Sequence, residues 1–164
     1  MSATLAELVT PHLDRADLAA RVAAFYVAVD EAVAAHGPIC RNRGLCCSFG
    51  RFGHSLFVTI VELVYFVRCN RDLRQAEGGS TCRYHVDGVC RARDSRPLGC
   101  RVFFCDPLSQ HWQGPTYERG LTELKRIGTA FGIDYRYVEW LSALGELTAE
   151  KPGEQAGLTP SAGV

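Results

Sequence analysis

Eight cysteines are the residues of this sequence that could do chemistry, and seven of them fall into two groups. Thiolates are soft ligands that suit zinc, copper(I) and iron–sulfur clusters. Cys69 stands apart from both groups, and we expect it to be a small packed hydrophobic residue. The seven predicted metal ligands are Cys40, Cys46, Cys47, Cys82, Cys90, Cys100 and Cys105.

The spacing of these cysteines bears on the identity of the metal. Zinc ribbons have paired CxxC motifs, and this sequence contains none. Irregular spacing over two segments is compatible with a cubane cluster held by four thiolates, and six or seven thiolates also suffice for two metal ions that share sulfurs. Adjacent Cys46 and Cys47 alternate faces in an extended chain, so either they serve two metals or one of them is not a ligand. His85 has zinc-knuckle spacing from Cys82, but with so many thiolates we do not expect it to be a ligand.

Arginines gather around the second cysteine group. From Arg68 to Cys105 there are eight arginines and four carboxylates. Thiolate-ligated clusters are anionic, and guanidinium groups can donate hydrogen bonds to their sulfurs. We therefore predict that Arg96 and Arg101, which flank Cys100, contact the cofactor. A solvated basic loop, or one that contacts phosphate, is the alternative.

Composition and charge disfavour several classes of partner. The 18 basic and 18 acidic residues give zero formal net charge, whereas nucleic-acid and anionic-membrane binders usually carry a positive excess. The first residues lack the features of a signal peptide. The most apolar run, Leu56–Val67, contains Glu62 and is too short to cross a bilayer. We expect a cytoplasmic protein, in which clustered cysteines bind metal more often than they form disulfides.

Hydrophobic periodicity predicts helices in the first half of the chain. Thr4 and Glu7 form a capping box for a short helix, and Asp14 is expected to cap a long one. The apolar stripe of the long helix comprises Leu18, Val22, Phe25, Val29 and Val33. Thr59 and Glu62 form a second capping box, which opens an apolar helix, although a strand over part of this run is the alternative.

The second half is predicted to contain a long loop followed by two helices. Asn70–Pro115 shows no helical period, so we expect metal ligation to order it. One helix is predicted over 116–131, and another starts after Asp134 and ends at Gly145. These patterns predict a mainly α, small single-domain helical fold with a long cysteine-rich metal-binding loop. The domain would span 1–145, with its core motif at 40–107, and 146–164 would be a disordered tail.

Several of these motifs resemble the YkgJ-like cysteine-cluster family, which is described as a CxxCxxCC zinc- or iron-chelating domain. The opening CRNRGLCC keeps the glycine and double cysteine of that family, Thr59 and Glu62 match its helix start, and Cys82 matches its isolated cysteine. The stretch CRARDSRPLGCRVF matches its closing motif, including Pro97. The match covers roughly 40–107.

The sequence departs from this pattern at three places. Arg43 stands where the family has a cysteine, Ala92 and Arg93 replace an Ile-Tyr pair, and Cys105 is additional. We hypothesise that Cys105 supplies the thiolate missing at position 43.

The resemblance implies metal chelation and does not decide between zinc and iron. We expect a metal-cluster protein, iron–sulfur rather than zinc, with a redox or accessory role and a protein partner. The alternatives are a structural zinc-binding interaction module and a protein-modifying, methylase-like enzyme, so enzymatic activity is left open.

Overall fold

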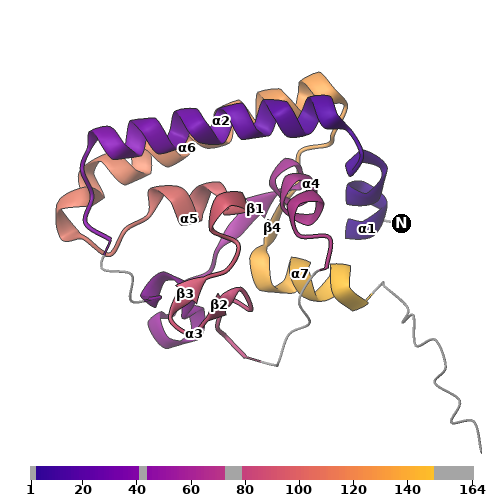
Figure 1. Ribbon diagram of the computed structural model, residues 1–164. Coiled ribbons are helices and arrows are strands. Elements are labelled where there is room, and N and C mark those ends of the chain that lie inside the picture. The colour runs from indigo at the N-terminus through magenta and orange to yellow at the C-terminus, as the bar shows by residue number, and fades with distance from the viewer. Residues whose placement is uncertain (1–2, 41–43, 73–78, 150–164) are drawn as a thin grey trace, which may run out of the picture.

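The computed structural model describes residues 3–40, 44–72 and 79–149, and it is mainly helical (Figure 1). The predicted fold class, a small mainly α domain, is confirmed. The helices are α1 (Leu5–Val9), α2 (Ala16–Ala35), α3 (Phe49–Phe52), α4 (Ile60–Cys69), α5 (Leu98–Val102), α6 (Gln110–Phe131) and α7 (Trp140–Ala149). The strands are β1 (Phe57–Thr59), β2 (His85–Val86), β3 (Val89–Cys90) and β4 (Tyr137–Glu139). Short 3₁₀ helices cover Thr10–His12, Leu45–Cys47, Arg93–Ser95 and Pro107–Ser109.

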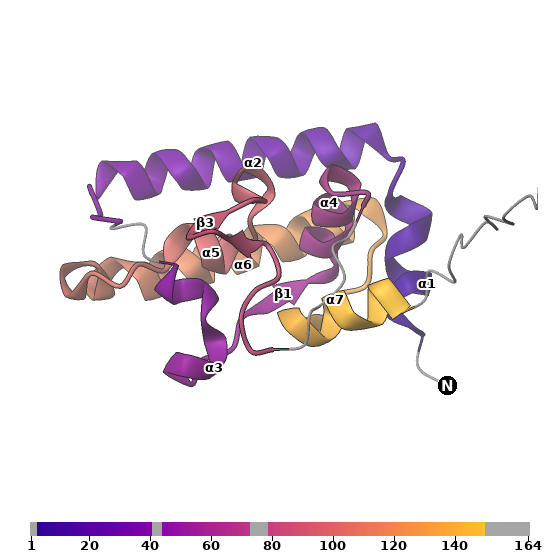
Figure 2. The same ribbon diagram turned by 60° about the horizontal axis from the view of Figure 1, so that its bottom comes forward.

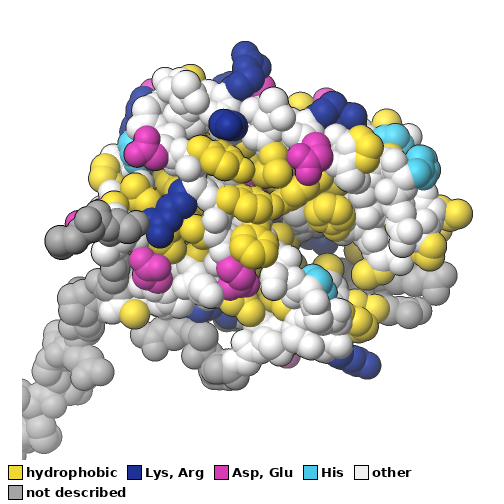
Figure 3. All heavy atoms as spheres, turned by 180° about the vertical axis from the view of Figure 1, so that it is seen from behind, with side chains coloured by type: hydrophobic (Ala, Val, Ile, Leu, Met, Phe, Trp, Pro, Cys, Tyr) yellow, Lys and Arg dark blue, Asp and Glu magenta, His cyan; other side chains and the backbone are white. Residues whose placement is uncertain are grey.

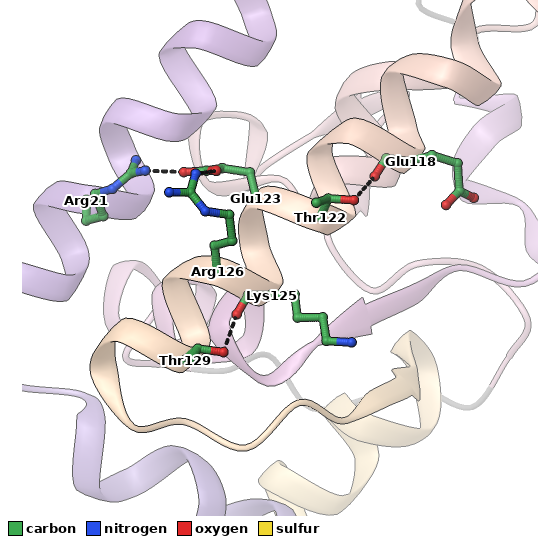
Figure 4. A network of polar contacts seen from close by, with 7 residues as sticks. All are labelled: Arg21, Glu118, Thr122, Glu123, Lys125, Arg126 and Thr129. Carbon is green, nitrogen blue, oxygen red and sulfur yellow. Dashed lines mark hydrogen bonds and ion pairs between the residues drawn. The ribbon is translucent and has the colours of Figure 1, made fainter.

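The two long helices, α2 and α6, lie side by side, and α4 and α5 pack against them (Figures 1 and 2). We call α2, α4, α5 and α6 the helical scaffold. Arg21 of α2 forms an ion pair with Glu123 of α6, and Arg126 donates to the same carboxylate at 2.7 Å (Figure 4). This network lies at the surface, so apolar packing supplies most of the stability of the helix pair.

The long helix α2 buries the predicted stripe, since all five of its residues are less than 9% exposed. The capping box at Thr4 and Glu7 is also confirmed, with both reciprocal hydrogen bonds present. The predicted cap of α2 is wrong, because the N-cap is Arg15 and makes no side-chain cap. Asp14 lies outside the helix and pairs with Arg71 at the surface.

The central helix is α4, and seven of its ten residues are buried. Its capping box at Thr59 and Glu62 is confirmed. The strand alternative is correct just before the helix, where β1 pairs antiparallel with β4 and aligns Val58 with Val138. The apolar run therefore changes from strand to helix at Thr59, which ends β1 and caps α4.

The predicted end of α6 at Phe131 is confirmed, but its predicted start and both predicted boundaries of α7 are wrong. Helix α6 begins at Gln110, because Trp112 and Gln113 bury their side chains ahead of Pro115, which lies inside the helix. Residues 137–139 form β4, so α7 begins only at Trp140 and continues past Gly145 to Ala149. The part of the predicted tail from 150 onward lies outside the described residues.

The predicted loop is largely built from short elements. Between residues 79 and 115 the chain forms the β2–β3 hairpin, α5 and the start of α6. Leu98 and Val102 of α5 are completely buried in the core. Elements of two to five residues are too short to produce a detectable period, which is why the sequence pattern missed them.

Hydrophobic side chains also lie at the surface, and many of them gather on the face seen in Figure 3. Four of the exposed aromatic residues are Phe57, Phe103, Tyr135 and Tyr137, each at least 38% exposed. Tyr137 stacks on Phe57 with ring centroids 5.3 Å apart. In the described part of the chain, no helix has the length and apolarity needed to cross a membrane.

Candidate metal centre

The seven predicted cysteine ligands all line one cavity of about 390 Å³, which we call the thiol cavity. They come from segments spread over residues 40–105, yet all of them line the same cavity. Cys69 does not line the thiol cavity, and the expectation that it is packed is wrong, because it is exposed at the end of α4. All eight cysteines are free thiols, so no disulfide joins these segments.

Backbone hydrogen bonds hold the two cysteine groups together. The Cys82 amide donates to the Cys47 carbonyl at 2.7 Å, and the Gly50 amide donates to the Ser80 carbonyl at 3.1 Å. Ser48 and Thr81 form an antiparallel bridge between these contacts. The double cysteine and the isolated cysteine therefore lie opposite each other because their main chains pair.

Glycine is required at position 44 for two reasons. Gly44 has φ +64° and begins the 3₁₀ helix that carries Cys46 and Cys47. A Cβ at this position would lie 2.0 Å from Nε2 of His85. The left-handed backbone and the close approach of the imidazole together account for the glycine of the opening motif.

The β2–β3 hairpin positions Cys90. Its two-residue turn has positive φ at both Asp87 (51°) and Gly88 (79°), as a type I′ turn requires. Cys90 is thereby paired with His85 across the hairpin. The Arg91 amide donates to the Tyr84 carbonyl at 2.7 Å and continues the pairing.

A buried carboxylate positions the helix that carries Cys100. Glu62 is 2% exposed, and its Oε1 accepts a hydrogen bond from the Leu98 amide at 2.7 Å, at the start of α5. Its Oε2 accepts from the Thr59 amide at 2.7 Å. Burial raises the pKa of Glu62, although the hydrogen bonds that it accepts oppose that change. The capping box of α4 and the closing motif are thus parts of one hydrogen-bonded unit.

The structure gives Arg101 a different set of contacts from the one predicted. Its side chain is 3% exposed and donates to the carbonyls of Arg96 and Asp94 and to Oδ2 of Asp30. Its guanidinium also lies 4.0 Å from the ring centroid of Tyr26. Arg101 does not line the thiol cavity, so the predicted contact with the cofactor has no support in this geometry.

Arg96, the other predicted arginine, does line the thiol cavity. Its positive charge helps to lower the pKa of Cys46 and opposes the rise in the pKa of Cys100. Its Nε is buried and makes no hydrogen bond within the described residues. Arg96 therefore places a positive charge near the thiols of the cavity.

The thiols differ in acidity. The Cys47 thiol donates to the Cys46 sulfur, which lowers the pKa of Cys46 to about 6 and raises that of Cys47. Burial raises the pKa of Cys82 and of Cys100. The pKa of Cys46 is thus shifted in the opposite direction from those of Cys47, Cys82 and Cys100.

Cys105 lies near the opening motif, since the charges of Cys46 and Cys40 both affect its pKa. This placement suits the hypothesis that Cys105 supplies a thiolate there. Arg43 itself lies outside the described residues.

The side chains that line the thiol cavity are not arranged as a ligand set in this conformation. No group of three or more His, Cys, Asp or Glu residues in the described ranges is positioned to hold a metal ion. The thiol cavity therefore brings sulfurs to one region without placing them around one point.

Trp140 and His85 of the cavity wall are not among the predicted site residues. Trp140, at the start of α7, lines the thiol cavity from the far end of the chain, and no motif near the cysteines could have indicated it. His85 also lines it, and the Cys82-x2-His85 spacing was the signal that was set aside. Nε2 of His85 is buried and makes no hydrogen bond with any residue described.

No protein family, curated protein or solved structure matched this chain. The chemistry of the site therefore follows from its own residues.

Proposed function

We propose that this protein binds a metal centre in the thiol cavity, and that the centre is an iron–sulfur cluster in preference to zinc. One observation carries the proposal: seven free thiols from distant parts of the chain line a single cavity of about 390 Å³. Scattered structural cysteines would not converge in this way. Soft thiolate ligands suit iron–sulfur clusters and zinc.

The size of the thiol cavity favours a multinuclear centre. Four sulfurs around one tetrahedral zinc ion, at about 2.3 Å each, lie roughly 3.8 Å apart and leave no space between them. Seven thiols around an open cavity provide more ligands and more room than one zinc ion uses. The nearby charge of Arg96 also suits an anionic thiolate centre.

Binding requires the side chains of the cavity wall to turn. No three of the potential ligands described are yet arranged around one point, so several cysteines must change rotamer when the centre is bound. Cys40, Cys46 and Cys105 are exposed and have room to do so. The buried backbone contacts around Cys82 and Cys100 would keep the frame of the site in place.

We infer a redox or accessory role beside a protein partner, in the cytoplasm. A solvent-accessible cavity with exposed thiols at its edge suits electron exchange or transfer of the centre. The exposed aromatic residues offer a surface on which such a partner could pack.

The experiment is anaerobic loading followed by metal analysis. Protein prepared without oxygen is supplied with ferrous iron and sulfide, or with zinc, and the metal and sulfide contents are measured. We expect a brown protein that retains iron and sulfide in stoichiometric amounts and whose visible absorption is bleached by dithionite. A colourless protein that retains only zinc would establish the zinc alternative, and retention of neither would refute metal binding.

Two matched serine variants make the test specific. Cys100→Ser removes a thiol of the thiol cavity, whereas Cys69→Ser removes the thiol that lies outside it. We expect Cys100→Ser to lose most of its bound metal and Cys69→Ser to retain all of it. Equal retention by both variants would show that the thiol cavity is not the site.

A further inference from the structure

Trp140 places a hydrogen-bond donor in the wall of the thiol cavity. Its side chain is 2% exposed, and its indole ring packs edge-on against Phe66 with ring centroids 4.7 Å apart. Its backbone amide donates to the Leu56 carbonyl at 2.8 Å, which holds the residue at the start of α7. The position of the indole is therefore set by packing and by the main chain.

The indole N–H lacks an ordinary acceptor. Nε1 of Trp140 is buried and makes no hydrogen bond with the residues that the structure describes. Indole nitrogen is only a donor, and a buried tryptophan usually finds a partner for it. A buried donor left unpaired is costly, so its location beside seven thiols calls for an explanation.

Cys82 is the buried cysteine of the same cavity wall, so its sulfur is the acceptor that this donor would use. A neutral thiol is a weak acceptor, whereas a thiolate accepts strongly. A hydrogen bond from the indole to a free thiol is therefore weak, whereas one to a metal-bound thiolate is charge-assisted.

We infer that Trp140 is a positioning residue for the metal centre, donating its indole N–H to the Cys82 thiolate when that sulfur is a ligand. The inference rests on the proposed function and goes beyond it, because it assigns a role to a residue outside the cysteine motifs. Hydrogen bonds from the surrounding protein orient metal ligands and tune the centre that they hold. The same donor favours an anionic, thiolate-rich centre over a neutral ligand.

The first test uses the two tryptophans of the chain as reporters. Trp112 is also buried, but it stacks on His36 with ring centroids 4.6 Å apart and does not line the thiol cavity. Protein with ¹⁵N-labelled indoles is titrated with zinc, which is thiophilic and diamagnetic, and both indole resonances are followed by NMR. We expect the Trp140 indole proton to move downfield and exchange more slowly with solvent, while that of Trp112 stays in place.

The second test is a pair of variants. Trp140→Phe keeps an aromatic ring against Phe66 and removes the N–H, and Trp112→Phe makes the same change away from the thiol cavity. We expect Trp140→Phe to weaken zinc binding by about 10- to 100-fold in a chelator competition, as loss of such a contact usually does. With an iron–sulfur cluster loaded, we expect its reduction potential to become more negative in Trp140→Phe alone.

The outcomes separate the inference from the proposed function. If the wild-type protein binds metal but the Trp140 resonance does not move and Trp140→Phe binds equally tightly, the inference is overturned and the metal site stands. If the wild-type protein binds no metal, the proposed function fails and the inference fails with it. If Trp140→Phe does not fold, the NMR titration of the wild-type protein decides.

Discussion

The helical scaffold and the wall of the thiol cavity differ in whether their buried polar groups have hydrogen-bond partners. In the scaffold, both oxygens of Glu62 accept hydrogen bonds, and each of the three guanidinium nitrogens of Arg101 has an acceptor. Tyr26 Oη is an exception there. In the cavity wall, nitrogens of His85, Arg96 and Trp140 make no hydrogen bond with described residues. The scaffold is held by contacts within the chain, whereas the wall carries groups suited to contact a ligand.

This difference predicts that metal acts on the wall far more than on the scaffold. Binding at thiolate sites contributes folding free energy, on the order of 10 kcal/mol for structural zinc in a small domain. We expect metal loading to raise the protection from hydrogen exchange strongly for the amides of residues 44–53 and 79–106. For the amides of α2 we expect only the gain that comes from a higher free energy of global unfolding. Hydrogen exchange with and without metal measures this. Equal gains at all amides would indicate that the two regions unfold as one unit.

Removing the Arg101 guanidinium tests how much its contacts between the helical scaffold and the closing motif contribute to stability. Arg101→Met leaves two carbonyls and Asp30 without their donor, and we expect the free energy of unfolding to fall by about 3 kcal/mol. Denaturant unfolding of the metal-free protein measures it. Arg91→Met is the control, because Arg91 is exposed and its 3.7 Å pair with Asp87 lies at the surface. A loss below 1 kcal/mol would mean that the Arg101 contacts do not hold the motif in place.

Glu62→Gln tests the hydrogen bonds that join the capping box of α4 to the start of α5, through the pH dependence of the stability. The amide group places a donor against backbone N–H groups, so we expect a loss of about 2 kcal/mol near neutral pH. Because burial raises the pKa of Glu62, the folded state holds its proton more tightly than the unfolded state does.

The sign of the pH effect follows from that shift. The stability of the wild-type protein relative to Glu62→Gln should be greatest below the ordinary pKa of 4.5, and should fall as the pH rises from there through the raised value. Urea unfolding of both proteins across this range measures the difference. A relative stability that rises with pH would show that the hydrogen bonds outweigh burial.

The smallest expected effect is the difference in stability between alanine substitutions at two glycines that have the same φ angle. Gly44 and Gly53 both have φ +64°, but an added Cβ meets His85 only at position 44 and open space at position 53. We expect Gly53→Ala to cost about 1 kcal/mol from backbone strain, and Gly44→Ala to cost roughly 1 kcal/mol more. Thermal unfolding compares them. Equal losses would mean that the imidazole moves aside freely.

Local signals in the sequence predicted the elements that depend on local physics. The capping boxes at Thr4 and Thr59 and the buried stripe of α2 follow from side-chain types at fixed spacing, and the structure contains all three. Asp14 was wrongly chosen as a cap because a capping residue near a helix start is only a propensity. Helix α5 is positioned by contacts with α2 and α6, which no local pattern encodes. The β2–β3 hairpin, in contrast, has a local signal in its Asp87-Gly88 turn, which the prediction did not use.

The cysteines of the candidate site could be predicted from the sequence, but the other residues that surround them could not. The seven cysteines stand out by type, and the structure brings all of them to one cavity. Arg101 could not be placed from proximity to Cys100, because successive residues of a helix point in different directions. Trp140 is 35 residues beyond the last of these cysteines, so only the folded chain reveals its place in the wall.

The distance of Trp140 along the chain also has a consequence for biosynthesis. The opening cysteines leave the ribosome long before β4 can pair with β1 and seat the indole beside Cys82. A metal ion bound at that stage would therefore contact only some of the cysteines of an incomplete cavity. If the thiol cavity holds a metal centre, its completion would follow the pairing of β4 with β1, which places Trp140 at the start of α7.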